Sequence, residues 1–339
     1  MNTVSVIVPC RNEIRHVQAF LESLLAQDLG ADIDCEFLIA DGMSDDGTRQ
    51  ILREWQPRFK AIEILDNEKR FVSNGLNLAL RRARGEIVIR MDVHAVYAPD
   101  YIRQCVAAIL GGHADNVGGP ALLQGVTYSE RAICLAYQSK FGCGGARFHD
   151  AGYEGYVDTV TYGCWRRSTL ERIGGFDEEF VRNQDDELNL RLVRQGGKIW
   201  QTPKIRSWYR PRSSVRALAR QYAQYGYWKT RVIRKHQIPA SWRHLVPGAF
   251  VLTLILTGIS APFVPTGAHL FVAVLAAYGV ASITASILAC RTLHNVSLLP
   301  VMPLMFGAYH LPYGVGFLRG LYDLALSKKP SAGASVLVR

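Results

Sequence analysis

Two carboxylates in this chain stand where apolar runs end, and one of them is Asp92. The run EIVIRMD is mostly apolar, and His94 follows Asp92 two positions later. A carboxylate and an imidazole at this spacing could both reach one divalent cation, and mixed oxygen and nitrogen ligands suit Mn²⁺ somewhat better than Mg²⁺. A strand-end Asp that caps the next turn would leave the same pattern, so both interpretations stay open.

Asp41 ends the apolar run FLIAD in the same way and begins ADGMSDDGT, a run rich in turn-forming residues. One interpretation is a turn in which Ser44 or Asp46 caps a helix that begins near Gly47. The other is a carboxylate that accepts hydrogen bonds from a nucleotide base or ribose. The residues alone favour neither interpretation.

A third acidic cluster, Asp185-Asp186-Glu187, stands at the start of an amphipathic run that predicts a helix. The N-terminal end of a helix favours negative charge, so capping would account for one or two of these carboxylates. A third is more than capping requires, and one of them, kept ionised by the helix end, could take a proton from an acceptor hydroxyl. Together with a metal-type Asp92, this cluster suggests displacement at a phosphate-activated carbon.

The first 120 residues alternate between strand and helix patterns, which predicts βαβ units, a mostly parallel sheet and an α/β fold. In such sheets ligands bind outside the carboxyl ends of the strands, where residues 11–13, 41–46 and 92–94 stand. The expected strands are 4–9, 37–41, 62–66 and 86–92, and the expected helices are 16–26, 47–55, 73–83 and 99–110.

The charge of the chain is divided unevenly. Its 39 Lys and Arg against 29 Asp and Glu give a formal net charge of +10. Residues 1–202 carry 23 basic and 28 acidic side chains, whereas residues 203–244 carry 11 basic and no acidic ones. Aromatic residues interleaved with basic ones would suit nucleic acid, but an uncharged apolar stretch follows directly. The pattern therefore favours an amphipathic interfacial segment on anionic lipids and no nucleic-acid partner.

An apolar region covers residues 245–320. Its segments 246–264 and 268–290 are each about long enough to span a bilayer core, which needs about 20 residues. A third segment, 298–318, contains three prolines. The positive-inside tendency places the basic segment, and the domain before it, in the cytoplasm. A third full span would carry Arg319 and the tail outside, so we favour a proline-broken re-entrant or interfacial segment over a third span.

Seven scattered cysteines without a CxxC spacing indicate reduced thiols rather than a disulfide framework or a zinc site. The N-terminus enters an apolar run with no basic region before it, so no cleaved signal peptide is expected. We thus divide the chain into a catalytic domain over 1–202, a basic segment over 203–244, a membrane region over 245–320 and a tail over 321–339.

Four motifs, VSVIVPCRNE, ADGMSDDGT, RMDVHA and GGFDEEFVRNQDDELNLRL, follow one another in the order and spacing of family 2 glycosyltransferases. With FGCGGARF, YRPRSSVRALARQYAQYGYWK and the apolar tail, they make nearly the whole chain resemble bacterial exopolysaccharide glucosyltransferases of the succinoglycan type. The resemblance implies a GT-A fold, which is a Rossmann-like sheet flanked by helices. It also implies a UDP-sugar donor, a divalent metal cofactor (Mn²⁺ or Mg²⁺), and inversion at the anomeric carbon in one in-line step.

The resemblance also implies roles for individual residues. Asp92 matches the first Asp of the family's DxD motif and would contact ribose or the metal, and Asp185 matches the Asp of its ED motif, the general base. From the basic segment, Arg210 and Arg212 have an alternative role in closing the donor site. The residues expected to bind the nucleotide sugar are Pro9, Asn12, Glu13, Asp41, Asp92, Arg210 and Arg212.

The chain departs from the family pattern at both motifs. Asp92-Val93-His94 replaces DxD, which leaves open whether His94 ligates the metal, and Gln184 replaces the Glu of the ED motif. Asp186 and Glu187 are therefore secondary candidates for the base. The QxxRW signature of processive synthases is absent, which argues against a processive polymer synthase.

These features predict a glycosyltransferase at the bacterial inner membrane with its catalytic domain in the cytoplasm. It would move a hexose, glucose from UDP-glucose, onto a lipid-linked oligosaccharide in exopolysaccharide or cell-surface glycan biosynthesis. Other polysaccharide-assembly enzymes are further expected partners. Two alternatives are a polyisoprenyl-phosphate glycosyltransferase and a non-catalytic membrane protein that binds a nucleotide sugar, and the three intact carboxylates Asp41, Asp92 and Asp185 argue against the second.

Overall fold

The computed structural model describes residues 1–292 and 294–328, and the chain forms two compact units. The sheet unit comprises Met1–Leu122 and Arg147–Arg210, and the helical unit comprises Leu123–Ala146 and the described residues from Pro211 onward. This division differs from the predicted boundary at residue 202. Residues 203–210 belong to the sheet unit because they contain a strand that pairs there, and residues 123–146 belong to the helical unit because they contain a helix that packs there.

The sheet unit is built on eight strands in the order β3-β2-β1-β4-β9-β6-β10-β8. Strands β3, β2, β1 and β4 are parallel, β9 runs antiparallel between β4 and β6, and β10 is parallel to β6. The predicted α/β class with a mostly parallel sheet is confirmed. The strands are β1 (Asn2–Cys10), β2 (Ile33–Asp41), β3 (Ile62–Asp66), β4 (Ile87–Arg90), β6 (Asn116–Gly119), β8 (Gly155–Tyr156), β9 (Thr161–Arg166) and β10 (Ile199–Gln201).

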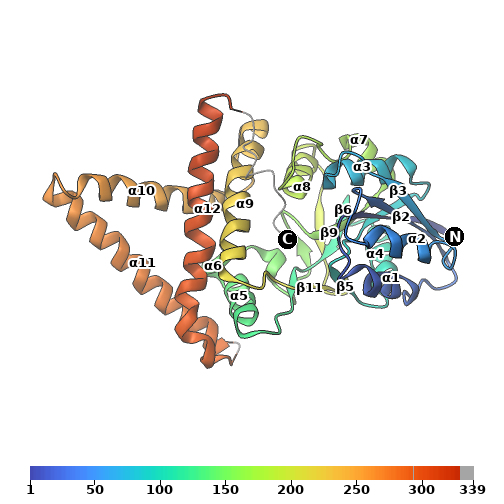
Figure 1. Ribbon diagram of the computed structural model, residues 1–339, viewed down its shortest axis with the longest axis horizontal. Coiled ribbons are helices and arrows are strands. Elements are labelled where there is room, and N and C mark those ends of the chain that lie inside the picture. The colour runs from blue at the N-terminus through green and yellow to red at the C-terminus, as the bar shows by residue number, and fades with distance from the viewer. Residues whose placement is uncertain (293, 329–339) are drawn as a thin grey trace. The chain divides into compact units, whose positions relative to one another are not determined.

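Helices cover both faces of this sheet (Figure 1), because alternate residues of a strand point to opposite faces. Val4, Val6 and Val8 of β1 pack in a core with α1, α2 and α4, whereas Ile7 packs in a second core with α3, α7 and α8. These helices are α1 (Val17–Leu25), α2 (Thr48–Trp55), α3 (Val72–Arg82), α4 (Tyr101–Leu110), α7 (Arg167–Ile173) and α8 (Gln184–Arg194), and a short 3-10 helix covers Arg147–His149.

The register of the parallel strands brings their carboxyl ends to one edge. Cys10 lies beside Asp41, and Asp41 lies beside Asp66, in adjacent strands. Strand β4 ends at Arg90, two residues earlier than predicted, because the backbone of Asp92 bonds instead to the side chain of Tyr97. A small sheet follows in the order β5-β11-β7, from the strands β5 (Ala95–Tyr97), β11 (Ser207–Tyr209) and β7 (Leu122–Leu123).

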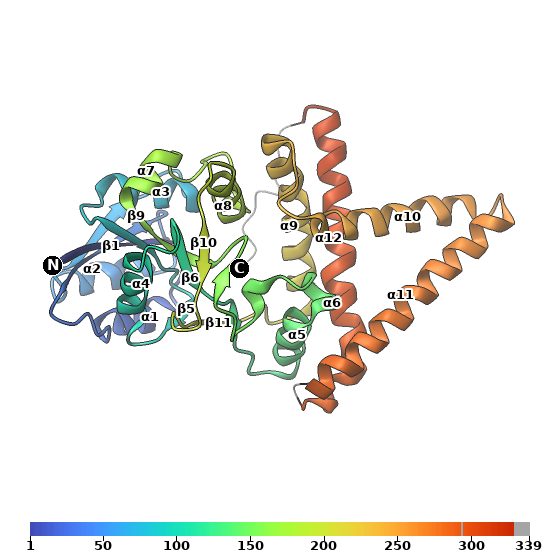
Figure 2. The same ribbon diagram turned by 180° about the vertical axis from the view of Figure 1, so that it is seen from behind.

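The helical unit is organised around two long helices, α9 (Val215–His236) and α12 (Met302–Ala325), which lie side by side in both views (Figures 1 and 2). Their contacts advance together along both helices, from Tyr222 against Tyr309 to Tyr227 against Asp323, so the pair is parallel. Glycines permit the close approach, since a Cβ atom at Gly316 would lie 1.9 Å from the carbonyl oxygen of Ala223.

This packing corrects part of the interpretation of the basic segment. Tyr227 and Trp228, two aromatic residues of the segment that was predicted to lie on lipids, are buried within the helical unit instead. The remaining elements of the unit are α5 (Tyr128–Gln138), α6 (Lys140–Cys143), α10 (Val246–Ser260), α11 (Pro265–Thr292) and the 3-10 helices Trp242–His244 and Val296–Val301.

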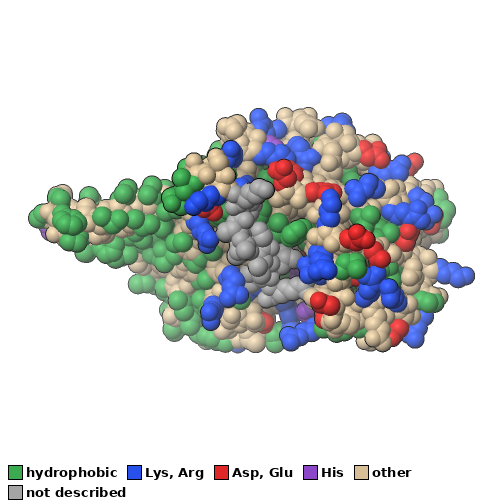
Figure 3. Space-filling view, turned by 45° about the horizontal axis from the view of Figure 1, so that its top comes forward, with side chains coloured by type: hydrophobic (Ala, Val, Ile, Leu, Met, Phe, Trp, Pro, Cys, Tyr) green, Lys and Arg blue, Asp and Glu red, His purple; other side chains and the backbone are tan. Residues whose placement is uncertain are grey.

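Helices α10 and α11 form an antiparallel hairpin whose surface is hydrophobic (Figure 3). Two apolar helical stretches, Trp242–Ser260 and Pro265–Thr292, have the length and composition to cross a membrane, with mean hydropathies of 1.4 and 2.1. Only 11% of each is buried in the protein, whereas a core helix would be mostly buried.

The third apolar segment differs from its prediction. Residues 302–325 form one continuous helix, α12, rather than a segment broken by its prolines. Pro303 occupies the first turn, where a missing N–H costs no hydrogen bond, and only Pro312 lies inside the helix. The helix also continues past residue 320, where the tail was expected to begin, and residues 329–339 of that tail lie outside the described residues.

Candidate active site

The centre of the site is a buried guanidinium at the carboxyl edge of the sheet. Arg90, the last residue of β4, has a side chain that is 4% exposed. Its Nε and Nη2 atoms donate to the two carboxylate oxygens of Asp92, each at 3.0 Å, and its Nη1 donates to Asp185. Arg90 and Asp92 are two residues apart and so lie on one face of the chain, the face that α8 covers. The structure thus brings together the two carboxylates predicted for the chemistry.

The loop that carries Asp92 is held by tyrosines. The Tyr97 hydroxyl lies 2.6 Å from the backbone nitrogen of Asp92, which donates to it, and donates to the Asp92 carbonyl at 3.2 Å. The ring of Tyr162 packs 5.7 Å from that of Tyr97, and Tyr162 has a left-handed backbone (φ 63°) beside an irregularity in the β6–β9 pairing. Burial raises the pKa of both tyrosines well above the usual value, so both stay neutral. A strained residue beside a bulge is a common feature of functional sites.

Asp185 lies in the first turn of α8, where the helix end favours a carboxylate. Burial, the largest cause, together with Asp92 and Asp186, raises the pKa of Asp185 to about 6, although the Arg90 guanidinium acts in the opposite direction. Its side chain is 42% exposed, so solvent offsets part of the effect of burial on this pKa. A carboxylate with a raised pKa suits a general base at neutral pH.

The two secondary base candidates differ in their surroundings. Glu187 is fully buried, and its carboxylate is paired with Arg191 one turn later on α8, with Oε2 2.6 Å from Nη2. This pairing favours a structural role for Glu187 rather than that of a base. Asp186 shares the first turn of α8 with Asp185 and stays a candidate.

Asp41 lies at the end of β2 with a fully buried side chain. Its oxygens accept from the Ser44 hydroxyl at 2.5 Å and from the Ser44 backbone nitrogen, and Arg49 lies 3.4 Å away. Of the two interpretations, the turn accounts for these contacts, while nucleotide binding by Asp41 stays a prediction. The helix cap is Gly47 rather than Ser44 or Asp46, and Asp46 accepts from the Thr48 backbone instead.

The loop after β1 is bound to the loop after β2. The Asn12 backbone nitrogen donates to Ser44 Oγ at 2.8 Å, and the Asn12 side-chain oxygen accepts from the Asp45 nitrogen at 3.0 Å. The Glu13 nitrogen donates to Thr48 Oγ1 at 2.7 Å. These bonds place Asn12 and Glu13 at the same edge as Asp41, as predicted from the strand ends. Pro9 lies in β1 beside Ala40 of β2.

The two predicted arginines belong to different units. Arg210 follows Tyr209, whose partner in the β5–β11 ladder is Ala95, so the register brings Arg210 to the strand end that carries His94. Arg212 belongs to the helical unit, where its Nε lies 3.3 Å from Gln221 Oε1.

The predicted metal site can be tested against the donor set. Among the described residues, no group of three or more His, Cys, Asp or Glu side chains could hold a metal ion. The Nδ1 atom of His94 lies 3.9 Å from Glu13 Oε1, and each Asp92 oxygen accepts one bond from Arg90. Each oxygen keeps a further lone pair, and Mg²⁺ commonly uses one or two carboxylates together with substrate phosphates. The residues therefore fit a cation that substrate phosphates would help to hold, and they do not form a complete protein site.

Sequence reasoning missed Arg90, Tyr97 and Tyr162. The sequence does contain a signal for Arg90, because a single charged residue in an otherwise apolar strand requires a partner of opposite charge. Asp92, two residues later, lies on the same face and is the nearest candidate. The left-handed backbone of Tyr162 left no such signal in the residue type.

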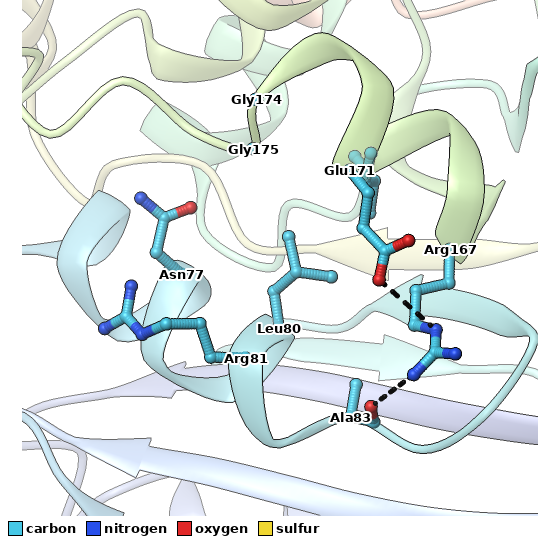
Figure 4. A pocket seen from close by; sticks show the side chains of 9 residues that line it. Asn77, Leu80, Arg81, Ala83, Arg167, Glu171, Gly174 and Gly175 are labelled. Atoms are coloured by element: carbon cyan, nitrogen blue, oxygen red, sulfur yellow. Dashed lines mark hydrogen bonds and ion pairs between the residues drawn. The ribbon is translucent and has the colours of Figure 1, made fainter.

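A surface hollow of about 290 Å³ has a lining that includes none of these carboxylates (Figure 4). Residues of α3 and α7, such as Leu80 and Arg167, line it. The Arg167 side chain donates a hydrogen bond to the Ala83 carbonyl and forms an ion pair with Glu171. Its lining contains none of the predicted site residues, so it is not part of the candidate active site.

Comparison with known proteins defines the class. The family described as glycosyl transferase family 2 matches residues 5–166. The succinoglycan biosynthesis protein ExoA of Rhizobium meliloti (strain 1021) is 32% identical over 244 residues, which are 71% of this chain and 73% of that protein. The chain belongs to glycosyltransferase family 2. It is a glycosyltransferase of polysaccharide or glycan biosynthesis.

Further relatives agree with this family. A dolichyl N-acetyl-alpha-D-glucosaminyl phosphate 3-beta-D-2,3-diacetamido-2,3-dideoxy-beta-D-glucuronosyltransferase of Methanococcus voltae is 30% identical over 270 residues, which are 76% of this chain and 83% of that protein. Among solved structures, the mannosyltransferase PcManGT from Pyrobaculum calidifontis, in complex with GDP-Man and Mn²⁺, has a TM-score of 0.59 at 21% identity and covers 94% of this chain and 87% of its own. S. aureus TarS 1-349 with UDP-GlcNAc has a TM-score of 0.51 at 15% identity, covering 96% and 92%. These likenesses confirm the GT-A fold.

Proposed function

We propose that this chain is an inverting hexosyltransferase that moves glucose from UDP-glucose onto a lipid-linked oligosaccharide. The observation that carries the proposal is the meeting of Asp92 and Asp185 on one guanidinium at the carboxyl edge of the sheet. An inverting transfer requires a base for the acceptor hydroxyl and neutralisation of charge on the leaving diphosphate. The two carboxylates lie on different elements, one on the β4 loop and one on α8, and so can serve these two sides of one sugar.

In the proposed step, the acceptor hydroxyl oxygen attacks the anomeric carbon while the bond from that carbon to the diphosphate oxygen breaks. Asp185 accepts the hydroxyl proton, and the nucleoside diphosphate leaves with the electron pair of the broken bond. Asp92 lies on the donor side, with Asn12, Glu13 and Arg210 at the same edge. A divalent cation, when bound, would neutralise the leaving diphosphate, and Asp92 with His94 would hold it.

The acceptor is proposed to be lipid-linked because the chain carries two helices long and apolar enough to cross a membrane. Trp242, 75% exposed, and Arg243 lie in the short 3-10 helix before α10, and both residue types are typical of the membrane–water interface. The Methanococcus relative, named for a dolichyl-phosphate substrate, supports the same acceptor class. By the positive-inside tendency, we place the sheet unit on the cytoplasmic face.

Asp185→Asn tests the base. This variant keeps the size of the side chain but cannot take up a proton, so transfer should be lost while UDP-glucose binding survives. The measurement uses the full-length chain in detergent, UDP-[¹⁴C]glucose and membranes of the expressing cells, with label counted in the organic extract and binding measured by calorimetry. Asp186→Asn is the matched control in the same turn of α8.

Normal transfer by Asp185→Asn would reject the base assignment, and loss of transfer in Asp186→Asn alone would move the base by one residue. UDP-GlcNAc and GDP-mannose are compared with UDP-glucose as donors in the same assay, and a clear preference for either would reject glucose. Label on a lipid that carries one sugar only would favour a polyisoprenyl-phosphate glycosyltransferase.

A further inference from the structure

Arg90 is a charge in the interior of the protein. It ends β4, which lies between β1 and β9 in the middle of the eight-stranded sheet. A buried charge is tolerated only where it is paired and hydrogen-bonded, and a well-packed apolar residue would often serve stability equally well. Stability is therefore a weak reason for an arginine here, and the groups that it holds suggest another.

The planar guanidinium holds two carboxylates from different parts of the fold. One side of the fork binds both oxygens of Asp92, and Nη1 binds Asp185, which is 95 residues away in sequence. Asp92 is itself fixed, because the Tyr97 hydroxyl holds both its backbone nitrogen and its carbonyl. The position of the guanidinium, and with it the position of Asp185, therefore depends on the anchor at Asp92.

We propose that Arg90 is a positioning residue that couples the donor side of this site to the acceptor base. Its guanidinium orients Asp185 because it is anchored on Asp92, so whatever engages Asp92 also acts on Asp185. The inference rests on the proposed function, since it takes Asp92 as the donor-side group and Asp185 as the base. The group touches neither reacting sugar in this scheme and acts through the two carboxylates.

A lysine cannot replace this arrangement, although it keeps the charge. An ammonium group is a single point without the planar fork, so it cannot bind both Asp92 oxygens and Asp185 in the same geometry. A displacement of about 1 Å at a reacting group costs about 100-fold in rate. Arg90→Lys should therefore lower kcat by about 100-fold while the KM for UDP-glucose changes less than about threefold.

Arg191→Lys is the matched control. Arg191 is another largely buried arginine of the sheet unit that forms an ion pair on α8, with Glu187, outside the reacting groups. If loss of a buried arginine pair acts only through folding, both variants should lower the thermal transition and neither should lower kcat per folded molecule. We expect this result for Arg191→Lys and a loss of kcat for Arg90→Lys.

A double-mutant cycle separates action through Asp185 from an independent effect. Arg90→Met, Asp185→Asn and the double variant are compared by residual UDP release from UDP-glucose, using the full-length chain with a lipid extract of the expressing cells. If Arg90 acts through Asp185, adding Arg90→Met to Asp185→Asn should change the residual rate less than about threefold. The double variant removes the Asp185 carboxylate that Arg90→Met alone would leave unpaired but keeps that of Asp92, so the folding of each variant is checked by its thermal transition.

The outcomes distinguish this inference from the function on which it rests. A wild-type kcat in Arg90→Lys, with an inactive Asp185→Asn, would overturn the role of Arg90 and leave the base assignment intact. Losses that multiply in the double variant, or a donor KM that rises in proportion to the fall of kcat, would also overturn it. An active Asp185→Asn would instead reject the proposed base. Two results together would support the positioning role of Arg90. Arg90→Lys should lower kcat selectively, and the rate losses of Arg90→Met and Asp185→Asn should not multiply in the double variant.

Discussion

Asp185 should give this enzyme an acid limb in its pH–rate profile. Burial raises the pKa of this carboxyl to about 6. A base works only in its deprotonated form, so activity should rise with pH through the pKa and level off above it. At this pKa the ionised fraction is about 91% at pH 7 and about 9% at pH 5, so kcat/KM should fall about tenfold from pH 7 to pH 5. An ordinary aspartate, with a pKa near 3.9, would be about 93% ionised at pH 5 and almost fully ionised at pH 7, so the profile would be nearly flat.

The assay measures kcat/KM for UDP-glucose between about pH 4.5 and pH 8 at constant ionic strength, with UDP release as the readout. Solvent reaches part of the Asp185 side chain, so the midpoint should lie at or below about 6 and above the ordinary value. Arg90→Met sharpens the test, because removal of the guanidinium, which lowers the pKa, should move the limb to higher pH. A flat profile from pH 5 to pH 7, or a limb that moves to lower pH in Arg90→Met, would refute this reasoning.

Three further predictions concern the metal, the helix pair and the membrane. His94→Ala should raise the Mn²⁺ concentration required for half-maximal transfer, and an unchanged requirement would remove His94 from the metal ligands. Gly316→Ala should overpack the contact between α9 and α12, which lowers the free energy of unfolding by about 1–3 kcal/mol and lowers the thermal transition temperature. Gly307→Ala should leave the transition temperature unchanged, because a Cβ atom there meets nothing within 4 Å. Reversal of the exposed charges at Arg234 and Lys235 to Glu should weaken binding of the full-length chain to anionic liposomes in flotation, and binding equal to wild type would contradict the lipid role of the basic segment.

The sheet was predictable because its strands carry local signals. Residues 62–66 form the predicted strand with identical bounds, and the strand ends place the loops near Asn12, Asp41 and Asp92 at one edge. The long-range contacts were not predictable in this way. No local pattern reveals that residues 123–146 join the helical unit, or that Tyr227 of α9 bonds to Asp323 of α12, because both depend on packing between distant segments.

The sequence predicted the carboxylates of the site but not Arg90, the residue that binds both of them. Asp92 and Asp185 were found because acidic residues at a strand end and at a helix start are visible in the sequence. Their connection through Arg90 depends on which face of β4 is covered by α8, and the sequence does not specify the helix that covers a face. Glu187 looked equivalent to its neighbours until the structure placed it in the interior beside Arg191.

The parallel pairing of α9 and α12 has a consequence for any attempt to make this enzyme water-soluble. Two parallel neighbours need a connection that returns along the length of the first, and for the 22 residues of α9 that return is about 33 Å. The α10–α11 hairpin lies in this connection. A shortened chain that ended before Leu245 would lack α12 and leave the buried Tyr227 hydroxyl without its partner Asp323. Replacing the hairpin by a flexible linker of at least 10 residues, at about 3.3 Å per residue, would keep α12 in place.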